Sequence, residues 1–137
     1  MNPHPYLRAY MAGIVVPTIF VLGIFAFFCV ARFGYNVEFP IERAIVFPLA
    51  LVPNFWGVWN IFYVAMRSHR RLPLGIHGAL LPAILLPVAF FMIRTINGWL
   101  PGYFATAFWL LLPWLLIVYY LLWKHLVGFL NRMMEIA

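Results

Sequence analysis

The sequence is poor in charged residues, poorer still in acids, and has a single cysteine. Charged residues make up 9% of its 137 residues, whereas soluble domains average about 25%. So few charges cannot cover a surface that faces water. This excludes an ordinary soluble domain and leaves lipid as the solvent for most of the exterior. The lone Cys29 excludes a disulfide within the chain and leaves the redox compartment open.

The acids number three, Glu38, Glu42 and Glu135, and none lies inside a long apolar run. Without an ionisable group in the membrane interior, a pump-type proton relay has no support. No serine lies beside a base in a nucleophile motif. No Cys, Asp or Glu accompanies the histidines, so a zinc or di-iron site is poorly supported as well. We therefore expect no enzymatic activity, no metal and no resident cofactor.

Hydrophobic residues make up 66% of the chain and fall into four runs. At a rise of 1.5 Å per helical residue, about 20 residues cross the hydrocarbon core. The runs predict an all-α membrane protein with four transmembrane helices in one domain, 1–137. The first run is longer than the apolar core of a signal peptide, so we expect it to remain as a helix. The spans are approximately 9–31, 44–66, 76–96 and 104–123.

Positive charges set the expected orientation, because Lys and Arg gather on the cytoplasmic side of a membrane. The formal net charge is +6. With the N-terminus inside, six of the nine basic residues lie on that side, namely Arg8, Arg67, Arg70, Arg71, Lys124 and Arg132. We expect both termini in the cytoplasm, in a multi-pass protein of a bacterial inner membrane. The basic residues lie between apolar runs, which indicates membrane lipids as partners and not nucleic acid.

Prolines interrupt every predicted span. Each removes a backbone donor and frees a carbonyl, which predicts a proline-kinked bundle. Kinks at comparable depth would widen the centre into a cavity, but tolerated bends, which are common in membrane proteins, are the simpler explanation. The prolines are Pro17, Pro48, Pro53, Pro82, Pro87 and Pro113.

An internal repeat recurs at an offset of 65 residues (78 − 13 = 65). Gly13-x-x-x-Pro17 matches Gly78-x-x-x-Pro82, and Pro48 matches Pro113. Two related helical hairpins would give this pattern. Chance is the alternative, since glycine and proline are common in membrane helices.

The predicted second span has two distinct faces at the 3.6-residue period of a helix. One face becomes more polar toward the cytoplasmic end. It predicts a cavity for a lipid or a quinone-like amphiphile, with the tail against tryptophans and the head near Arg67. An aromatic belt at the membrane interface is the alternative interpretation. The residues of this stripe are Trp56, Trp59, Asn60, Tyr63 and Arg67.

The other face of the same span is mostly small and includes Asn54 and Gly57. Small residues let helix backbones approach closely, and an asparagine can form a hydrogen bond across the contact. We therefore interpret Asn54 and Gly57 as helix-packing residues. At the cytoplasmic ends of the spans, Arg70, Arg71 and Lys124 are predicted to bind lipid headgroups.

The spacing Pro53-x-x-Trp56-x-x-Trp59-Asn60-x-x-Tyr63 resembles the tryptophan-rich stretch of the translocator/tryptophan-rich sensory protein family. The resemblance covers about one helix, and that family has more spans than the four predicted here. We transfer no residue role from it.

Segment 124–137 predicts an amphipathic C-terminal helix. Such a helix lies in the headgroup plane, docks on a partner, or extends the fourth span with one face against the bundle. Asn131, Arg132 and Glu135 fall on its polar side. Its apolar side is Leu126, Phe129, Leu130, Met133 and Met134.

The leading hypothesis is a small non-enzymatic membrane subunit or an amphiphile-binding protein, and a homo-oligomeric channel or transporter is the alternative. His77 and His125, near the cytoplasmic ends of two spans, leave haem binding as a remote alternative. Four helices make a thin bundle with little interior. We therefore expect a homo-oligomer or a place in a larger membrane complex.

Overall fold

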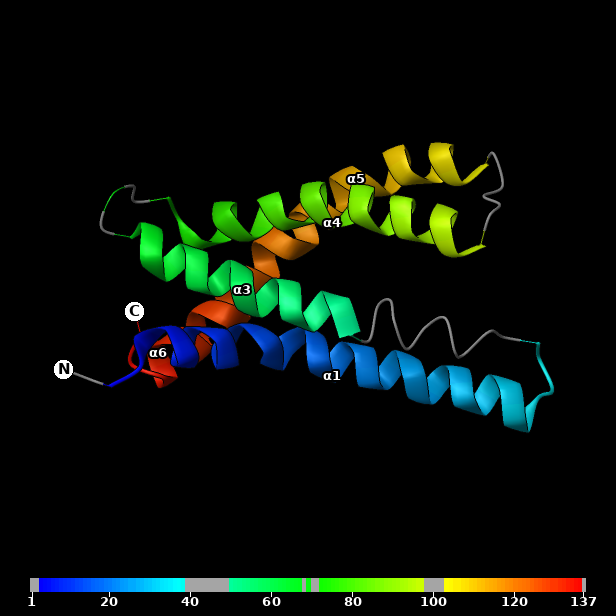
Figure 1. Cartoon of the computed structure of the whole chain (residues 1–137), viewed down its shortest axis with the longest axis horizontal. Coiled ribbons are helices and arrows are strands. Elements are labelled where there is room, and N and C mark those ends of the chain that lie inside the picture. The colour runs from blue at the N-terminus through cyan, green and yellow to red at the C-terminus, as the bar shows by residue number, and fades with distance from the viewer. Residues whose placement is uncertain (1–2, 39–49, 68, 70–71, 98–102, 137) are drawn as a thin grey trace. The chain divides into compact units, whose positions relative to one another are not determined.

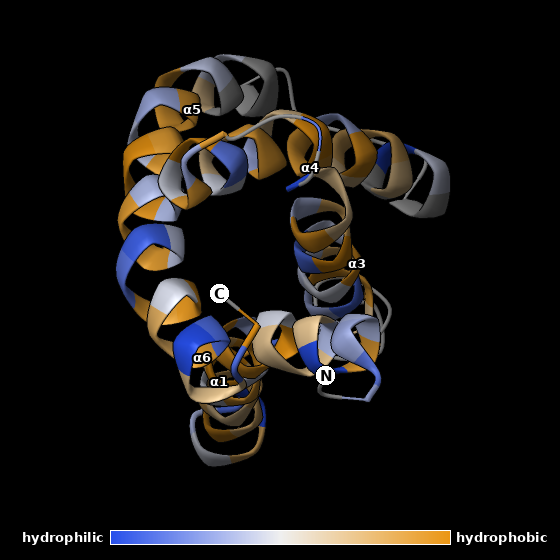
Figure 2. Ribbon diagram, turned by 90° about the vertical axis from the view of Figure 1, so that its left-hand side faces the viewer, coloured by the Kyte–Doolittle hydropathy of each residue, from blue (hydrophilic) through white to orange (hydrophobic). Residues whose placement is uncertain are grey.

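The computed structural model of the chain describes residues 3–38, 50–67, 69, 72–97 and 103–136. These residues form helices and no strand, which confirms the all-α prediction. Three helical segments are long and apolar enough to cross a membrane: Pro5–Gly34, Leu74–Met92 and Trp109–Met133. Figure 2 shows that hydrophobic residues predominate along the helices, with short hydrophilic stretches between them. The chain thus has the features of a multi-pass membrane protein.

The structure consists of two compact units. The first unit comprises Met1–Ala65 and Leu130–Ala137, and the second comprises Met66–Phe129. In the first unit, α1 (Pro5–Gly34) lies alongside α3 (Leu51–Met66), as Figure 1 shows. The second unit contains α4 (Leu74–Asn97), α5 (Tyr103–Leu122) and a π-helical segment, Trp123–Val127. The last helix, α6 (Gly128–Met133), follows that segment without a break.

Helix α1 begins and ends at residues suited to those positions. Pro5 is in the first turn of the helix, where its missing N–H leaves no hydrogen bond unmade. Beyond the last turn, Asn36 has a φ of 52°, and asparagine tolerates this left-handed conformation better than most residues. The next residue, Val37, donates its N–H to the Ala31 carbonyl at 3.1 Å. The chain is thereby turned away from the helix axis.

The buried face of α1 consists of small and medium-sized residues. They recur at three- and four-residue spacing, which keeps them on one side of the helix. Large apolar side chains of the same helix, such as Phe20 and Phe27, are exposed, as is usual for a surface that contacts lipid. The buried residues are Ala9, Ala12, Gly13, Val16, Pro17 and Val21.

In the second unit, α4 and α5 form an antiparallel hairpin. Gly75 and Gly78, at the start of α4, lie against Tyr120 and Trp123, at the end of α5 and just beyond it. Figure 1 shows the two helices running alongside each other. Helical structure then continues from α5 through Trp123–Val127 into α6. The predicted third and fourth spans, 76–96 and 104–123, thus lie within helices.

The second predicted span is covered only in part. Helix α3 has 16 residues, or about 24 Å of helix, which is shorter than the hydrocarbon core of about 30 Å. Residues 44–49 of that span, with Pro48, lie outside the described residues. A fourth span therefore stays a prediction. So do the kinks, because Pro17, Pro82, Pro87 and Pro113 lie inside helices that are continuous at those positions.

In the C-terminal segment, the residues that are buried and those that are exposed differ from the prediction. Asn131 is 1% exposed, whereas Phe129 and Met133 are 52% and 65% exposed. The prediction placed Asn131 on the outer, polar side with Arg132 and Glu135, as it would be on a helix at a water surface. A protein in lipid reverses this preference, because its polar side chains find partners inside and its apolar ones face outward.

Candidate functional site

Gly13 and Gly57 mark a close approach of α1 and α3 in the first unit. A Cβ atom added to Gly13 would lie 2.7 Å from the Trp56 carbonyl oxygen and 2.9 Å from the Gly57 Cα. One added to Gly57 would lie 2.6 Å from the Tyr10 ring. Real Cβ atoms essentially never come within 3.0 Å of such neighbours. The structure therefore places Gly57, a predicted packing residue, where only glycine lets the two helices lie this close.

Asn54 lies near the same contact and links the two helices through polar groups. Its side-chain oxygen accepts a hydrogen bond from the Tyr10 hydroxyl. Its amide donates to the Ala50 carbonyl one helical turn earlier, at 2.5 Å. The contact with Tyr10 extends the α1–α3 seam by one turn beyond the two glycines.

Asn60 is the buried polar centre of the first unit. Its amide nitrogen donates to the Ala9 carbonyl at 2.7 Å and to the Asn131 side-chain oxygen at 2.8 Å. Its own oxygen accepts from the Asn131 amide at 3.1 Å. Both side chains are buried, at 0% and 1% exposure. A carboxamide offers two donors and one oxygen acceptor, so all three groups of Asn60 have partners.

Asn131 was not among the predicted site residues. Its sequence position next to Arg132 made it look like part of a water-facing side. The signal that could have identified it is an uncharged carboxamide within a long, mostly apolar helical segment, Trp109–Met133. In lipid, such a side chain turns toward another polar group, here Asn60.

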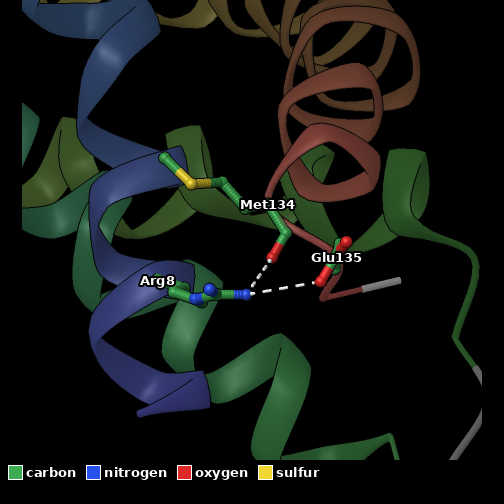
Figure 3. Close-up of polar contacts among 3 residues, drawn as sticks. All are labelled: Arg8, Met134 and Glu135. Carbon is green, nitrogen blue, oxygen red and sulfur yellow. Dashed lines mark hydrogen bonds and ion pairs between the residues drawn. The ribbon is translucent and has the colours of Figure 1, made fainter. Parts of the chain in front are cut away.

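Arg8 and Glu135 join the beginning of α1 to the end of α6 (Figure 3). The Arg8 guanidinium donates to the Met134 carbonyl at 3.1 Å and lies 3.8 Å from the Glu135 carboxylate. Both side chains are partly exposed, so the ion pair itself contributes little to stability. Together with the hydrogen bond to Met134, the ion pair holds the first turn of α1 beside residues 134–135.

Glu135 occupies a backbone position that glycine usually takes. Its φ is 55°, in the left-handed region that favours glycine at the end of a helix. The Ile136 N–H donates to the Asn131 carbonyl at 2.9 Å, and the Glu135 N–H donates to the Arg132 carbonyl at 3.0 Å. These two bonds form a Schellman cap, and the glutamate at its centre places a carboxylate beside Arg8.

The predicted ligand stripe on α3 divides into buried and accessible residues. Trp56 and Asn60 are 2% and 0% exposed, and the groups of Asn60 are engaged with other parts of the chain. Trp59 and Tyr63 are half-buried, and the Trp59 ring lies edge-on to Phe62. Arg67, beyond the end of α3, is exposed. Trp59 and Tyr63 are therefore the two stripe residues of the first unit whose side chains keep a substantial part of their surface accessible.

Glycines set the helix contact in the second unit as well. A Cβ atom on Gly78 would lie 1.9 Å from Cγ of Trp123, and one on Gly75 would lie 2.7 Å from the Tyr120 ring. His77, between them, is 2% exposed, and its ring lies edge-on to Trp123 with 5.9 Å between centroids. The start of α4 is therefore packed tightly on aromatic rings.

The predicted headgroup and haem residues have different surroundings. The Lys124 ammonium lies 5.6 Å from the centroid of the Tyr120 ring, within the range of a cation–π interaction, and its side chain is exposed. His125 is exposed whereas His77 is buried. Arg70 and Arg71 lie outside the described residues. Within the part of the chain that the structure describes, no three His, Cys, Asp or Glu side chains gather as a metal site would require.

Comparison of the chain with protein-family models, curated proteins and solved structures finds no match. The resemblance to the tryptophan-rich family thus remains a likeness over about one helix. The function has to be argued from the residues themselves.

Proposed function

We propose that the chain is a small integral membrane subunit that catalyses no reaction and binds a lipid or a quinone-like amphiphile. The observation that carries this proposal is the use of buried carboxamides. Asn60 and Asn131 bond to each other, and Asn60 also bonds to α1. Large apolar side chains such as Phe27 and Trp114 are exposed. Polar groups thus hold the helices together, and the outer surface suits lipid or a partner subunit.

The joined ends of the first unit support a four-span topology. Arg8 contacts Met134 and lies beside Glu135, so both ends of the described chain lie on the same side of the membrane. A chain that starts and finishes on one side crosses an even number of times. Three helical segments are long and apolar enough to span. A crossing by the second predicted span, 44–66, would complete an even number, and the excess of basic residues favours the cytoplasmic side for both ends.

The amphiphile is expected to lie against Trp59 and Tyr63. Both are half-buried and lie one turn apart on α3, so an apolar tail can run along them. Trp56 and Asn60 lie beneath that surface, because both side chains are buried in the packing of the first unit. Arg67 follows Tyr63 by one further turn in the sequence and would attract an anionic or carbonyl head.

Native mass spectrometry of protein extracted gently from its own membrane tests this function. We expect the chain to travel with a foreign subunit, a retained amphiphile, or both. Trp59→Ala and Tyr63→Ala should reduce the retained amphiphile. Val58→Ala serves as a matched control, because Val58 is 43% exposed on the same helix and lies outside the stripe. Equal retention in all three variants would remove the amphiphile site from α3.

If the same experiment showed a homo-oligomer without any foreign subunit, it would favour a channel or transporter. Flux of ions or small polar solutes into reconstituted vesicles would then decide. The proline argument for such a pore is weakened in the second unit. Pro82 is buried there, but Pro87 and Pro113 are exposed, so these three do not face a common centre.

A further inference from the structure

Helix α3 carries an exposed carboxamide, that of Asn54, near the middle of the predicted second span, 44–66. The other asparagine of this helix, Asn60, is buried and has a partner for each of its groups. An exposed polar side chain at mid-membrane depth has no water to bond with, so a polar group of another protein segment is its favourable partner. Asn54 therefore indicates a contact beyond the α1–α3 pair.

The Asn54 carboxamide has one donor and one acceptor position left. Its amide has two N–H groups, and one of them donates to the Ala50 carbonyl at 2.5 Å. Its oxygen has two lone pairs, and the Tyr10 hydroxyl donates to one of them. Within the described part of the chain, these two bonds leave the second N–H and the second lone pair available. A second Asn54 side chain offers the same two groups, so two copies are self-complementary at this position.

The chain already contains a reciprocal carboxamide pair of this kind. The amide of Asn60 donates to the Asn131 oxygen at 2.8 Å, and the amide of Asn131 donates to the Asn60 oxygen at 3.1 Å. Both side chains belong to the first unit and are buried. Two asparagines that meet across a two-fold axis form the same two bonds, and a single polar pair of this type fixes the register of paired helices.

The face of α3 around Asn54 suits a second copy of the same helix. Ile61 and Ala65 follow Asn54 by seven and eleven residues, which places all three on one side of the helix at the spacing of paired helices. Ile61 is half-buried and Ala65 is exposed. The small side chain of Ala65 lets two backbones approach closely. Trp59 and Tyr63, the amphiphile residues, fall on a different side at the same helical spacing.

We propose that this face of α3 binds the same face of a second copy of the chain, with the two Asn54 side chains paired across a two-fold axis. Both copies cross the membrane in the same direction, so the axis lies along the membrane normal and the two α3 helices run parallel. In each copy, the Tyr10 hydroxyl orients the carboxamide from within the chain. This inference relies on the proposed crossing of the membrane by 44–66, and it leaves the surface of Trp59 and Tyr63 uncovered.

Self-association is measured on the purified full chain in phosphatidylcholine vesicles, over a range of protein-to-lipid ratios. Copies that carry donor or acceptor dyes on Cys29, which is the single cysteine, report dimers by Förster transfer. Asn54→Leu should weaken dimerisation about tenfold, the effect expected for hydrogen bonds between membrane helices. Tyr10→Phe is the matched control, because it removes the bond within the chain but keeps the groups that pair the copies. It should dimerise as the parent does.

Two outcomes of this measurement would overturn the proposal. Equal losses in Asn54→Leu and Tyr10→Phe would show that the α1–α3 contact controls association, and not the Asn54 pair. A parent protein that stays monomeric at every protein-to-lipid ratio would show that lipid covers this face. The foreign subunit and the amphiphile are scored on native extracts instead, so failure of the dimer is distinguishable from failure of the proposed function.

Disulfide cross-linking tests which face of α3 forms the contact. In a Cys29→Ser background, Ala65→Cys should form a disulfide between two copies under mild oxidation, since the parallel seam brings the two positions together. Met66→Cys is the control, because it lies at about the same depth but about 100° around the helix. Equal cross-linking of both variants would indicate random collision and overturn the proposed face. Cross-linking of Ala65→Cys to a foreign protein in the native membrane, instead of to a second copy, would overturn the choice of partner.

Discussion

The two units solve the same packing problem with different chemistry. In the first unit, carboxamides reach between segments, with Asn60 bonded to Asn131 and to the Ala9 carbonyl. In the second, glycines bring α4 onto the rings of Tyr120 and Trp123. Burial of apolar surface gives helices no preference for each other over lipid. Hydrogen bonds and very close packing are the two substitutes. The first unit uses both, because Gly13 and Gly57 also bring α1 and α3 together, whereas the described contacts of the second unit are mainly close packing.

The largest effect is expected from Gly78→Ala in the second unit. The new methyl group would lie 1.9 Å from Cγ and 2.3 Å from Cβ of Trp123, atoms too close to the backbone to move aside easily. We expect a loss of about 3 kcal/mol in the free energy of unfolding, the upper range for overpacking. Thermal or denaturant unfolding in detergent micelles, followed by circular dichroism, measures it.

Gly23→Ala is the control for that substitution. Among the described residues, no atom beyond the helix's own neighbouring backbone lies within 4 Å of a Cβ at Gly23. Helix propensity is then the main change, and alanine should stabilise by up to about 1 kcal/mol. If Gly78→Ala proved as harmless as Gly23→Ala, the close packing of α4 on Trp123 would be wrong.

An intermediate effect is expected from the carboxamides of the first unit. Asn131→Leu leaves the Asn60 oxygen without its buried donor, at a cost of about 1–2 kcal/mol. Asn60→Leu should cost more, because Asn60 also bonds to α1. The double variant should lose less than the sum of the two, with a coupling of about 0.6–1.7 kcal/mol, as found between polar groups in membrane helices. Strictly additive losses in the same unfolding assay would contradict the direct pair.

The smallest effect is expected where the ends of the first unit meet. Arg8→Gln and Glu135→Gln each remove a partly exposed ion pair and should cost about 0.5 kcal/mol or less, with the loss vanishing at high salt. Glu135→Gly removes the same pair but also relieves the left-handed backbone at φ 55°. It should therefore be more stable than Glu135→Gln by about 1 kcal/mol. The reverse order would argue against the Schellman cap.

The positions of the helices could be predicted from the sequence, whereas most contacts between the helices could not. Long apolar runs predicted helices at 9–31, 76–96 and 104–123, and the structure has helices at Pro5–Gly34, Leu74–Asn97 and Tyr103–Leu122. The length of an apolar run predicts a helix, because a helix is the one structure in which a single segment can form all of its backbone hydrogen bonds in lipid. The packing role of Gly57 was predicted from its place on a face of small residues, which let helix backbones approach closely.

The partners of the polar residues could not be predicted in this way. The pair Asn60 and Asn131 are separated by 71 residues, and no local pattern connects positions so far apart. The predicted stripe placed Asn60 beside a ligand because helical spacing shows which residues share a face, but not which segment covers that face. The burial of His77 against Trp123 is a second case, because it depends on a glycine, Gly78, one residue later.

The separation between Asn60 and Asn131 also sets an order of events during synthesis. At about 5–20 residues per second, a ribosome needs roughly 4–14 s to add the 71 residues that follow Asn60, up to and including Asn131. Throughout that interval the Asn60 side chain can bond to Ala9, already made, but not to Asn131. The bond between Asn60 and Asn131 therefore forms only after the α4–α5 hairpin has been synthesised. A chain interrupted before Asn131 would expose an unpaired amide to the insertion machinery and to membrane proteases.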